Sequence, residues 1–346
     1  MSRGLLACLI SGFLPIVAFA QSEGTPSSPV LANQNPDWVM PRTEYGRPDL
    51  QGIWLFGSRT PLQRPMNLDM KRTYSEDEVK DLEQRMRARN AAQGEPLAAD
   101  RGAPEQGARI GQEADDAFLA HFREPEIVKI NGEYRTSVIV DPPNGRIPKR
   151  EGFMDFTAKR KASGLGDADG PEGQPLSGRC IMFGAAVPSL TPIMMNPNMQ
   201  IVQTEDYVMV MTEMVHDARI IRIGDEHFDN GVRNWMGDSV GHWEGDTLVV
   251  HSKNFRPEQS SGRSISMSED FEVEERYTLV GDNEIHFGFT VHDEQAYAQS
   301  FTGERTLTRN SFDEQIYEFA CHEGNYSLSG ILAGARRLEA LEDQQQ

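Results

Sequence analysis

The chain has few basic residues, few cysteines and, beyond its first 20 residues, no long hydrophobic run. Lys and Arg together number 34 against 53 Asp and Glu, so the formal net charge is −19. An acidic surface repels the phosphates of nucleic acids and of anionic lipids, which argues against both as partners. No second apolar stretch has the roughly 20 residues needed to span a bilayer. The composition is that of a soluble globular protein, and solubility is the simplest interpretation of the acidic balance.

Several motifs typical of enzymes are also missing. The chain contains no G-x-S-x-G elbow, no Walker loop, no dinucleotide fingerprint and no H-E-x-x-H motif. His216, His242, His251 and His322 could converge in space, but their spacing matches no common zinc-binding pattern. We therefore expect neither a metal nor a cofactor. What remains is cofactor-independent proton-transfer chemistry, or binding without chemistry.

The N-terminus has the pattern of a secretory signal peptide. Arg3 precedes the apolar run 4–20, which ends in Ala18-Phe19-Ala20, a small-residue site of the kind that signal peptidases cleave. We expect residues 1–20 to be removed and the mature protein to be periplasmic or secreted, with no stable membrane insertion. Residues 21–47, rich in Ser, Pro and Asn, are predicted to form a linker or an N-terminal arm.

Removal of the signal peptide leaves two cysteines, Cys180 and Cys321. In an oxidising compartment an even pair is predicted first to form a disulfide, and closing so long a loop contributes roughly 3–5 kcal/mol in the chain-entropy account. The alternative is a reactive thiol beside His322. It is the weaker interpretation, since neighbours on a strand point to opposite faces and His322 would not readily activate Cys321.

Short apolar segments separated by Gly, Asp and Asn turns predict a chain that is mainly β. The segments expected to be strands are 48–56, 127–130, 134–140, several within 199–255, 271–280, 284–292, 296–308 and 315–320. A helix with a Ser75–Glu78 capping box follows the first strand. Apolar residues at helical spacing over 327–341 predict a C-terminal helix packed against the sheet.

These strands predict an antiparallel meander that forms a lipocalin-like barrel or a strongly curved sheet, because closure removes exposed strand edges. An eight-stranded barrel can hold one small ligand. A two-sheet sandwich or a propeller-like arrangement fits the pattern less well. We expect residues 48–341 to form a single β-rich domain. Within it, the Gly- and Pro-rich segment 157–198 is predicted to be irregular and is a possible lid.

The segment 213–223 places charged residues where a strand should be apolar. Period-two alternation puts Asp217 and Arg219 on one face and His216 on the other, so either choice of core face takes a charge inward. Such a conflict is typical of functional sites. We predict that His216 acts as a general acid/base oriented by Asp217, with Arg219 stabilising negative charge. The alternative is a buried structural ion pair.

The segment 321–326, Cys-His-Glu-Gly-Asn-Tyr, joins the last expected strand to the terminal helix. His322 is its best candidate for a general acid/base. The residues beside it that are predicted to bind substrate are Glu323, Asn325 and Tyr326. The alternative is a turn that starts the helix, a geometry that Gly324 and Asn325 suit.

Polar and aromatic residues are also dense over 235–246. The residues predicted to bind substrate there are Trp235, Asp238 and Trp243. The two indoles are suited either to stacking on a ring or to filling the core. Glu244 and Asp246 flank Gly245 between two expected strands, which favours a hairpin turn over a functional role.

The chain resembles a large family of exported bacterial proteins, most of which have no assigned activity. The segments that carry the resemblance, which extends from about residue 48 to 337, are 48–54, 142–148, 179–180, 213–219, 235–239, 241–250 and 321–326. The resemblance implies export but no particular chemistry. His251 stands where similar proteins usually carry an acidic residue, which implies a different substrate if that position contacts it.

Two functions follow from these patterns. The first is an exported, cofactor-independent lyase, isomerase or hydrolase that acts by general acid/base chemistry on a small, partly hydrophobic molecule in a barrel cavity. The second is a lipocalin-like binding protein that does no chemistry. An enzyme is expected to bring a His and a carboxylate together in its cavity, whereas a carrier is expected to have a mostly apolar cavity with its His residues outside.

Overall fold

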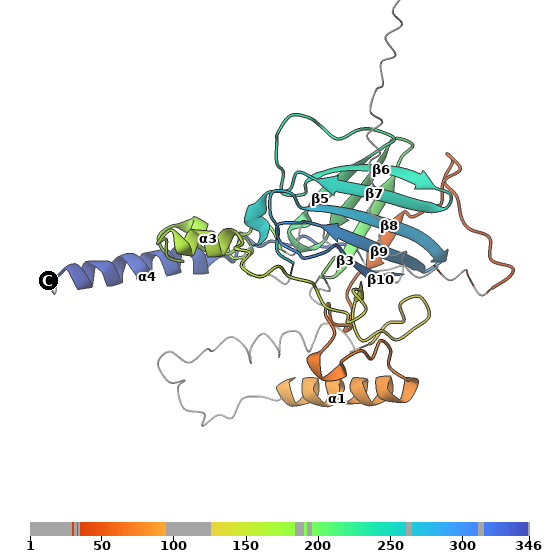
Figure 1. Ribbon diagram of the computed structural model, residues 1–346, viewed down its shortest axis with the longest axis horizontal. Helices are drawn as coiled ribbons and strands as arrows, with labels where there is room; N and C mark the ends of the chain where they lie inside the picture. The colour runs from red at the N-terminus through yellow and green to blue at the C-terminus, as the bar shows by residue number, and fades with distance from the viewer. Residues whose placement is uncertain are drawn as a thin grey trace, which may run out of the picture.

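Nine strands close into a barrel in the computed structural model of this protein (Figure 1). The structure describes residues 30, 33, 35–94, 126–183, 190–191, 196–260, 265–310 and 315–344. The strand order is β1-β3-β4-β5-β6-β7-β8-β9-β10, and β1 closes the ring by pairing with β10 as well as with β3. The prediction of a mainly β barrel with an N-terminal and a C-terminal helix is confirmed.

The elements have the following bounds. The strands are β1 (Gly52–Leu55), β2 (Ile139–Asp141), β3 (Asn198–Gln203), β4 (Tyr207–Thr212), β5 (Ala218–Ile223), β6 (Asp238–Glu244), β7 (Thr247–Lys253), β8 (Glu272–Gly281), β9 (Glu284–His292) and β10 (Phe301–Arg309). The α-helices are α1 (Glu76–Gly94), α3 (Phe156–Ala162) and α4 (Tyr326–Asp343). Short 3₁₀ helices are η1 (Met66–Leu68), η2 (Pro171–Gly173), η3 (Met214–His216) and η4 (Pro257–Ser260).

The barrel closes along one edge of β10, which two strands share. Trp54 and Leu55 of β1 pair with Arg309 and Thr308, while β2 pairs with the other end of β10 around Thr302. Neighbouring strands of the ring are antiparallel except β5 and β6, which are parallel. The predicted meander is therefore wrong at this step. Because β5 and β6 run in the same direction, the connection 224–237 must carry the chain back alongside the barrel.

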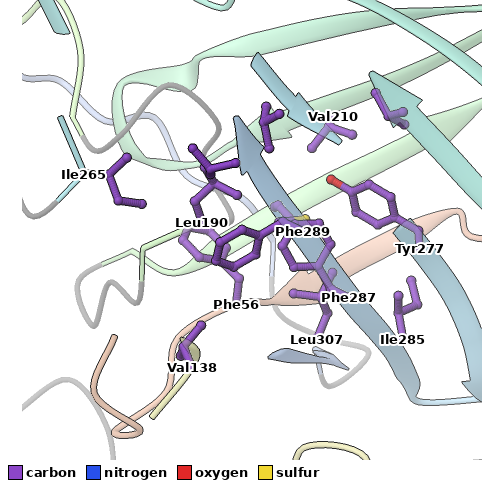
Figure 2. Close-up of a cluster of buried hydrophobic side chains, with 14 of the residues drawn as sticks. Phe56, Val138, Leu190, Val210, Ile265, Tyr277, Ile285, Phe287, Phe289 and Leu307 are labelled. Atoms are coloured by element: carbon purple, nitrogen blue, oxygen red, sulfur yellow. The ribbon is translucent and has the colours of Figure 1, made fainter. Parts of the chain in front are cut away.

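The interior of the barrel holds a large cluster of buried hydrophobic side chains (Figure 2). Alternate residues of β8 point inward, so Val273, Tyr277 and Leu279 are buried. The rings of Tyr277 and Phe287 lie 4.8 Å apart, and Phe287 contacts Phe289 at 5.9 Å between ring centroids. These aromatic contacts are at the distances typical of packed rings in a protein core.

A pair of opposite charges also lies inside the barrel. Arg219 of β5 is 2% exposed and Glu275 of β8 is 0% exposed. The two form a salt bridge, and the second guanidinium nitrogen lies 3.1 Å from Oε1 of Glu275 and 3.2 Å from the Tyr277 hydroxyl. Tyr277 in turn donates to Glu275 at 2.8 Å. The prediction that one charge of segment 213–223 faces inward is therefore confirmed.

The N-terminal part of the described chain lies against the barrel. Trp38 packs on the hydrophobic core and donates its indole N–H to Asp282 at 2.9 Å, while Arg42 forms an ion pair with Asp246. The helix α1 begins with the predicted capping box. The amide of Ser75 donates to the Glu78 carboxylate at 2.8 Å, and the Glu78 amide donates to Ser75 Oγ at 3.3 Å. The signal peptide expected at residues 1–20 lies outside the described residues.

Three local predictions are corrected by the structure. The expected hairpin 127–140 is reduced to a single bridge between Ile130 and Glu133, and Ile139–Asp141 pairs instead with β10. An isolated hairpin is marginal, so its second arm gains more by joining the barrel. Residues 315–320 form no strand, because the ring of strands is already closed without them. The segment 157–198 is not wholly irregular, since it contains α3 and η2.

The C-terminal helix forms as predicted but does not pack against the sheet. The helix α4 extends away from the barrel (Figure 1) and has no buried residue. Its contacts are with the segment before β3: Asn325 donates to the Gly178 carbonyl at 2.8 Å, and Arg336 donates to the Ala168 carbonyl at 3.0 Å. Leu338 stays 63% exposed.

The buried ion pair generates a test of the core. Replacing Glu275 with Gln is expected to lower the free energy of unfolding by about 3–5 kcal/mol, because Arg219 is left as an uncompensated buried charge. The double variant R219M/E275L is expected to recover most of that loss. Urea unfolding measures both. The control is Glu274→Gln, on the outer face of the same strand, and an equal loss in this control would contradict the prediction.

Candidate functional site

The disulfide predicted between Cys180 and Cys321 is present and joins residues 141 positions apart. It ties the segment 321–326 to residues 178–180, which follow α3 in the chain. Asn325 caps α4, accepting a hydrogen bond from the Leu328 amide at 3.4 Å. The side chains of His322 and Glu323 are exposed, and Tyr326 is 80% exposed. The geometry is that of a turn that starts a helix.

The three candidate residues of the segment 214–219, which are His216, Asp217 and Arg219, lie in different surroundings. Val215 and His216 adopt φ values of +61° and +46°, a tight turn that leaves the His216 side chain exposed. Asp217 is half-buried, and burial raises the pKa of its carboxyl to about 6 although His216 opposes the shift. Arg219 points into the barrel, where burial acts to lower its pKa but the charge of Glu275 outweighs burial and raises it.

The two candidate motifs are linked through the backbone rather than through a shared cavity. The amide of Tyr317 donates to Oε1 of the buried Glu213 at 3.4 Å, and the Glu213 carbonyl accepts from the His216 amide at 3.3 Å. The segment leading to His322 thus reaches the turn at His216. Neither imidazole, however, has a hydrogen-bonded carboxylate among the described residues.

A cavity of about 450 Å³ lies between α3, the segment 167–179 and η4. Its apolar wall includes Phe156, Leu176 and Trp235, the last of which was predicted to bind substrate. The Arg256 guanidinium stacks on the Trp235 ring at 4.3 Å from the ring centroid. The volume is in the usual range for small-molecule sites. The predicted possible lid therefore supplies one wall of a real cavity.

Positive charge exceeds negative charge around this cavity. Lys161 and Arg256 lie beside acidic partners, Lys161 3.4 Å from Asp167 and Arg256 3.3 Å from Glu258. Arg160 and Arg179 also line the cavity, and neither forms an ion pair within the described ranges. Besides Asp167 and Glu258, the described lining contains one acidic residue, Glu172. Nε of Arg160 is buried without a hydrogen-bond acceptor there. These two guanidiniums are the groups best placed to bind an anion.

The other residues of 235–246 have structural contacts. Trp243 packs on the barrel core, and Arg47 lies 5.9 Å from its ring centroid. Glu244 lies 2.5 Å from Arg276 and 3.2 Å from His242. It precedes the tight turn between β6 and β7, as the hairpin interpretation expected. Asp238, the remaining candidate, belongs to a separate cluster on the outer face of the barrel.

That cluster is a chain of four side chains. Nδ1 of His227 lies 2.9 Å from Oδ2 of Asp238, and Nε2 of His227 lies 2.8 Å from Nδ1 of His251. Nε2 of His251 lies 3.2 Å from Oε2 of Glu272. Arg222 also donates to Asp238 at 2.7 Å. We call Asp238, His227, His251 and Glu272 the outer-face relay.

Electrostatics keeps the ends of the relay ionised. Burial acts to raise the pKa of Asp238, but hydrogen bonds from Arg222, the Phe228 amide and His227 lower it. The hydrogen bond from His251 lowers the pKa of Glu272. Burial lowers the pKa of His227 although Asp238 opposes the shift. Two carboxylates thus flank two imidazoles.

Sequence reasoning missed His227, Arg160 and Arg179. His227 lies in the connection 224–237, where no periodicity indicates which face a side chain takes. The one signal was the presence of His251 where similar proteins usually carry an acid, because that imidazole is the partner of His227. Arg160 and Arg179 belong to the segment that was predicted to be irregular.

Wider comparisons add no assignment. Comparison with known proteins finds no match, either to a protein family or to a curated protein. Among the described residues, no group of three or more His, Cys, Asp or Glu is arranged to hold a metal ion. No helix in the described ranges is both long and apolar enough to cross a membrane.

The half-buried Asp217 generates a pH-dependent prediction. Its pKa is about 6 in the folded protein, against 3.8 ordinarily, so its contribution to stability is fully present below about pH 4 and is lost as pH rises through 6. Asp217→Asn is therefore expected to stabilise by about 1–2 kcal/mol near pH 7.5, a value discounted for partial exposure, and by less near pH 4.5. Thermal unfolding at both pH values measures this difference.

The matched control is Asp206→Asn, because Asp206 is exposed. It is expected to leave the melting temperature nearly unchanged at both pH values. A D217N variant that is less stable than wild type near pH 7.5 would contradict the assignment.

Proposed function

We propose that this protein is an exported binding protein for a small, partly hydrophobic organic anion, which it holds in the cavity beside α3. One observation carries the proposal: Arg160 and Arg179 line the same cavity as Trp235 and form no ion pair of their own within the described ranges. In a chain of net charge −19, such a local excess of positive charge is informative.

The lining supports a ligand with two chemical parts. A guanidinium binds a carboxylate or another oxyanion through two parallel hydrogen bonds. The indole of Trp235 and the ring of Phe156 offer apolar faces on which an aromatic or aliphatic body can pack. An aromatic or branched aliphatic carboxylate combines both features.

Binding is favoured over acid/base catalysis because of what lines this cavity. A catalytic site needs a His within reach of a carboxylate and of the substrate. The described residues that line the cavity include no histidine. The lyase, isomerase or hydrolase function expected from His322, His216, Asp217 and Arg219 therefore has less support than ligand binding does.

Export is part of the same proposal. The pattern of residues 1–20 and the resemblance to exported bacterial proteins both favour it, and the Cys180–Cys321 disulfide is compatible with an oxidising compartment. Expression of the full chain in a bacterium is expected to yield a periplasmic or secreted protein that begins at Gln21, as measured by intact mass. A cytoplasmic product that retains Met1 would contradict it.

Calorimetry on the mature protein tests the cavity. Phenyl- and indolyl-substituted carboxylic acids are expected to bind, and their uncharged primary amides to bind about tenfold or more weakly, because the amide forfeits charge-assisted hydrogen bonds. Arg179→Gln is expected to weaken the acids by a similar factor and to leave the amides unchanged. Trp235→Leu is expected to weaken both.

The matched control is Arg85→Gln, which removes the same charge from α1, a helix that lies below the barrel in Figure 1, apart from α3. It is expected to bind like wild type. The proposal fails if acids and amides bind equally well, or if R179Q and R85Q lower affinity to the same extent.

A further inference from the structure

The connection 224–237 crosses the outside of the barrel because it joins the parallel strands β5 and β6. Its far end is fixed by backbone hydrogen bonds, since Asn234 pairs with Asn254 and Arg256. Its first half begins with a backbone hydrogen bond from Gly224 to the Gly241 carbonyl at 2.8 Å and is otherwise held by side-chain contacts. His227 reaches both Asp238 and His251, and the Phe228 amide donates to Asp238 at 2.9 Å. Phe228 also covers Arg222, with the guanidinium 3.8 Å from its ring centroid.

Counting protons shows that the relay is complete in one protonation state. The carboxylates of Asp238 and Glu272 only accept, so Nδ1 of His227 and Nε2 of His251 must each carry a proton. The contact between the two rings needs one more proton, placed between Nε2 of His227 and Nδ1 of His251. Two neutral imidazoles carry two protons, and the relay needs three. The pair therefore shares one positive charge between two carboxylates.

A different proton count breaks the contact. With a fourth proton, two N–H groups face each other at 2.8 Å and both rings are cationic. With two protons, either two lone pairs face each other or one carboxylate loses its donor. The hydrogen bond between His227 and His251 is thus strongest over a window of pH and weakens on both sides of it, as in other coupled pairs of titrating groups.

We propose that the outer-face relay is a proton-binding site that fastens residues 225–233 to the barrel and releases them when the histidine pair takes up a fourth proton, which makes both rings cationic. This role is separate from ligand binding at α3. Protons from the solvent trigger the release, so no other ligand is required.

The groups around the pair set the direction of the response. The charged or titratable residues around the pair are Arg222 of β5, Asp225 of the connection, Asp238 of β6, Lys253 of β7, Glu272 and Glu274 of β8, and His292 of β9. The acids stabilise one shared charge. Burial lowers the pKa of His227 and that of His292, which acts against positive charge on the pair, whereas the hydrogen bond from His227 to Asp238 acts in its favour.

Hydrogen–deuterium exchange of the mature protein tests the proposal. The exchange rates of the Phe228 amide and of its neighbours are measured at each pH and corrected for the intrinsic rates. Protection is expected to fall about tenfold between about pH 7 and about pH 5, the effect of losing one charge-assisted hydrogen bond. In His251→Gln, protection is expected to be low at both pH values and to change less than about twofold. His242→Gln is the matched control, an exposed histidine of β6 that pairs with Glu244, and is expected to respond like wild type.

Ring-nitrogen NMR on wild-type protein with labelled histidine keeps the test independent of the variants. Three of the four ring nitrogens of His227 and His251 are expected to be protonated near neutral pH, and the fourth to gain its proton as Phe228 loses protection. A His251→Gln variant that keeps the wild-type pH response would overturn the proposal. So would opening of the loop while the pair holds three protons. Added zinc that protects the loop, reversibly with chelator, would also overturn it, by showing a metal in place of the proton.

Discussion

Closure of the barrel between β1 and β10 is the constraint on which the rest of the structure depends. Once Trp54 and Leu55 pair with Arg309 and Thr308, the ring has no free edge, and the inward residues of every strand meet in one core. Phe287, Phe289 and Tyr277 fill that core. The candidate cavity and the outer-face relay are found outside that core, on loops and on the outer face of the strands.

The charges inside the barrel serve the architecture. Arg219 and Glu275 come from strands that are not neighbours, so their contact spans the interior between β5 and β8. A one-residue slip of β5 would turn Arg219 outward and leave Glu275 buried without its partner. The pair thus makes incorrect registers of β5 less stable. This role can be important even if the pair contributes little to the net stability of the correct fold.

The cavity at α3 depends on covalent as well as on packing interactions. The segment that forms its wall lies outside the barrel and has few buried residues of its own. The Cys180–Cys321 disulfide ties this segment to the start of α4, and Asn325 and Arg336 bond its carbonyl groups. Arg179 is adjacent to the disulfide, so the same bond that holds the wall also positions a guanidinium. The cavity and the outer-face relay share no residue.

The sequence by itself determined the β-rich barrel, the capped helix α1, the helix α4, the disulfide partners and the presence of a charge among the inward residues of 213–223. These features depend on periodicity, capping and cysteine count, which are local or nearly local. Only the tertiary structure decided that Arg219 pairs with Glu275, that His227 meets His251, and that Arg179 and Trp235 share a cavity. The physical reason is that periodicity specifies which face of a strand a residue occupies, whereas its partner depends on strand order, on the parallel β5–β6 step and on the path of the connecting loops.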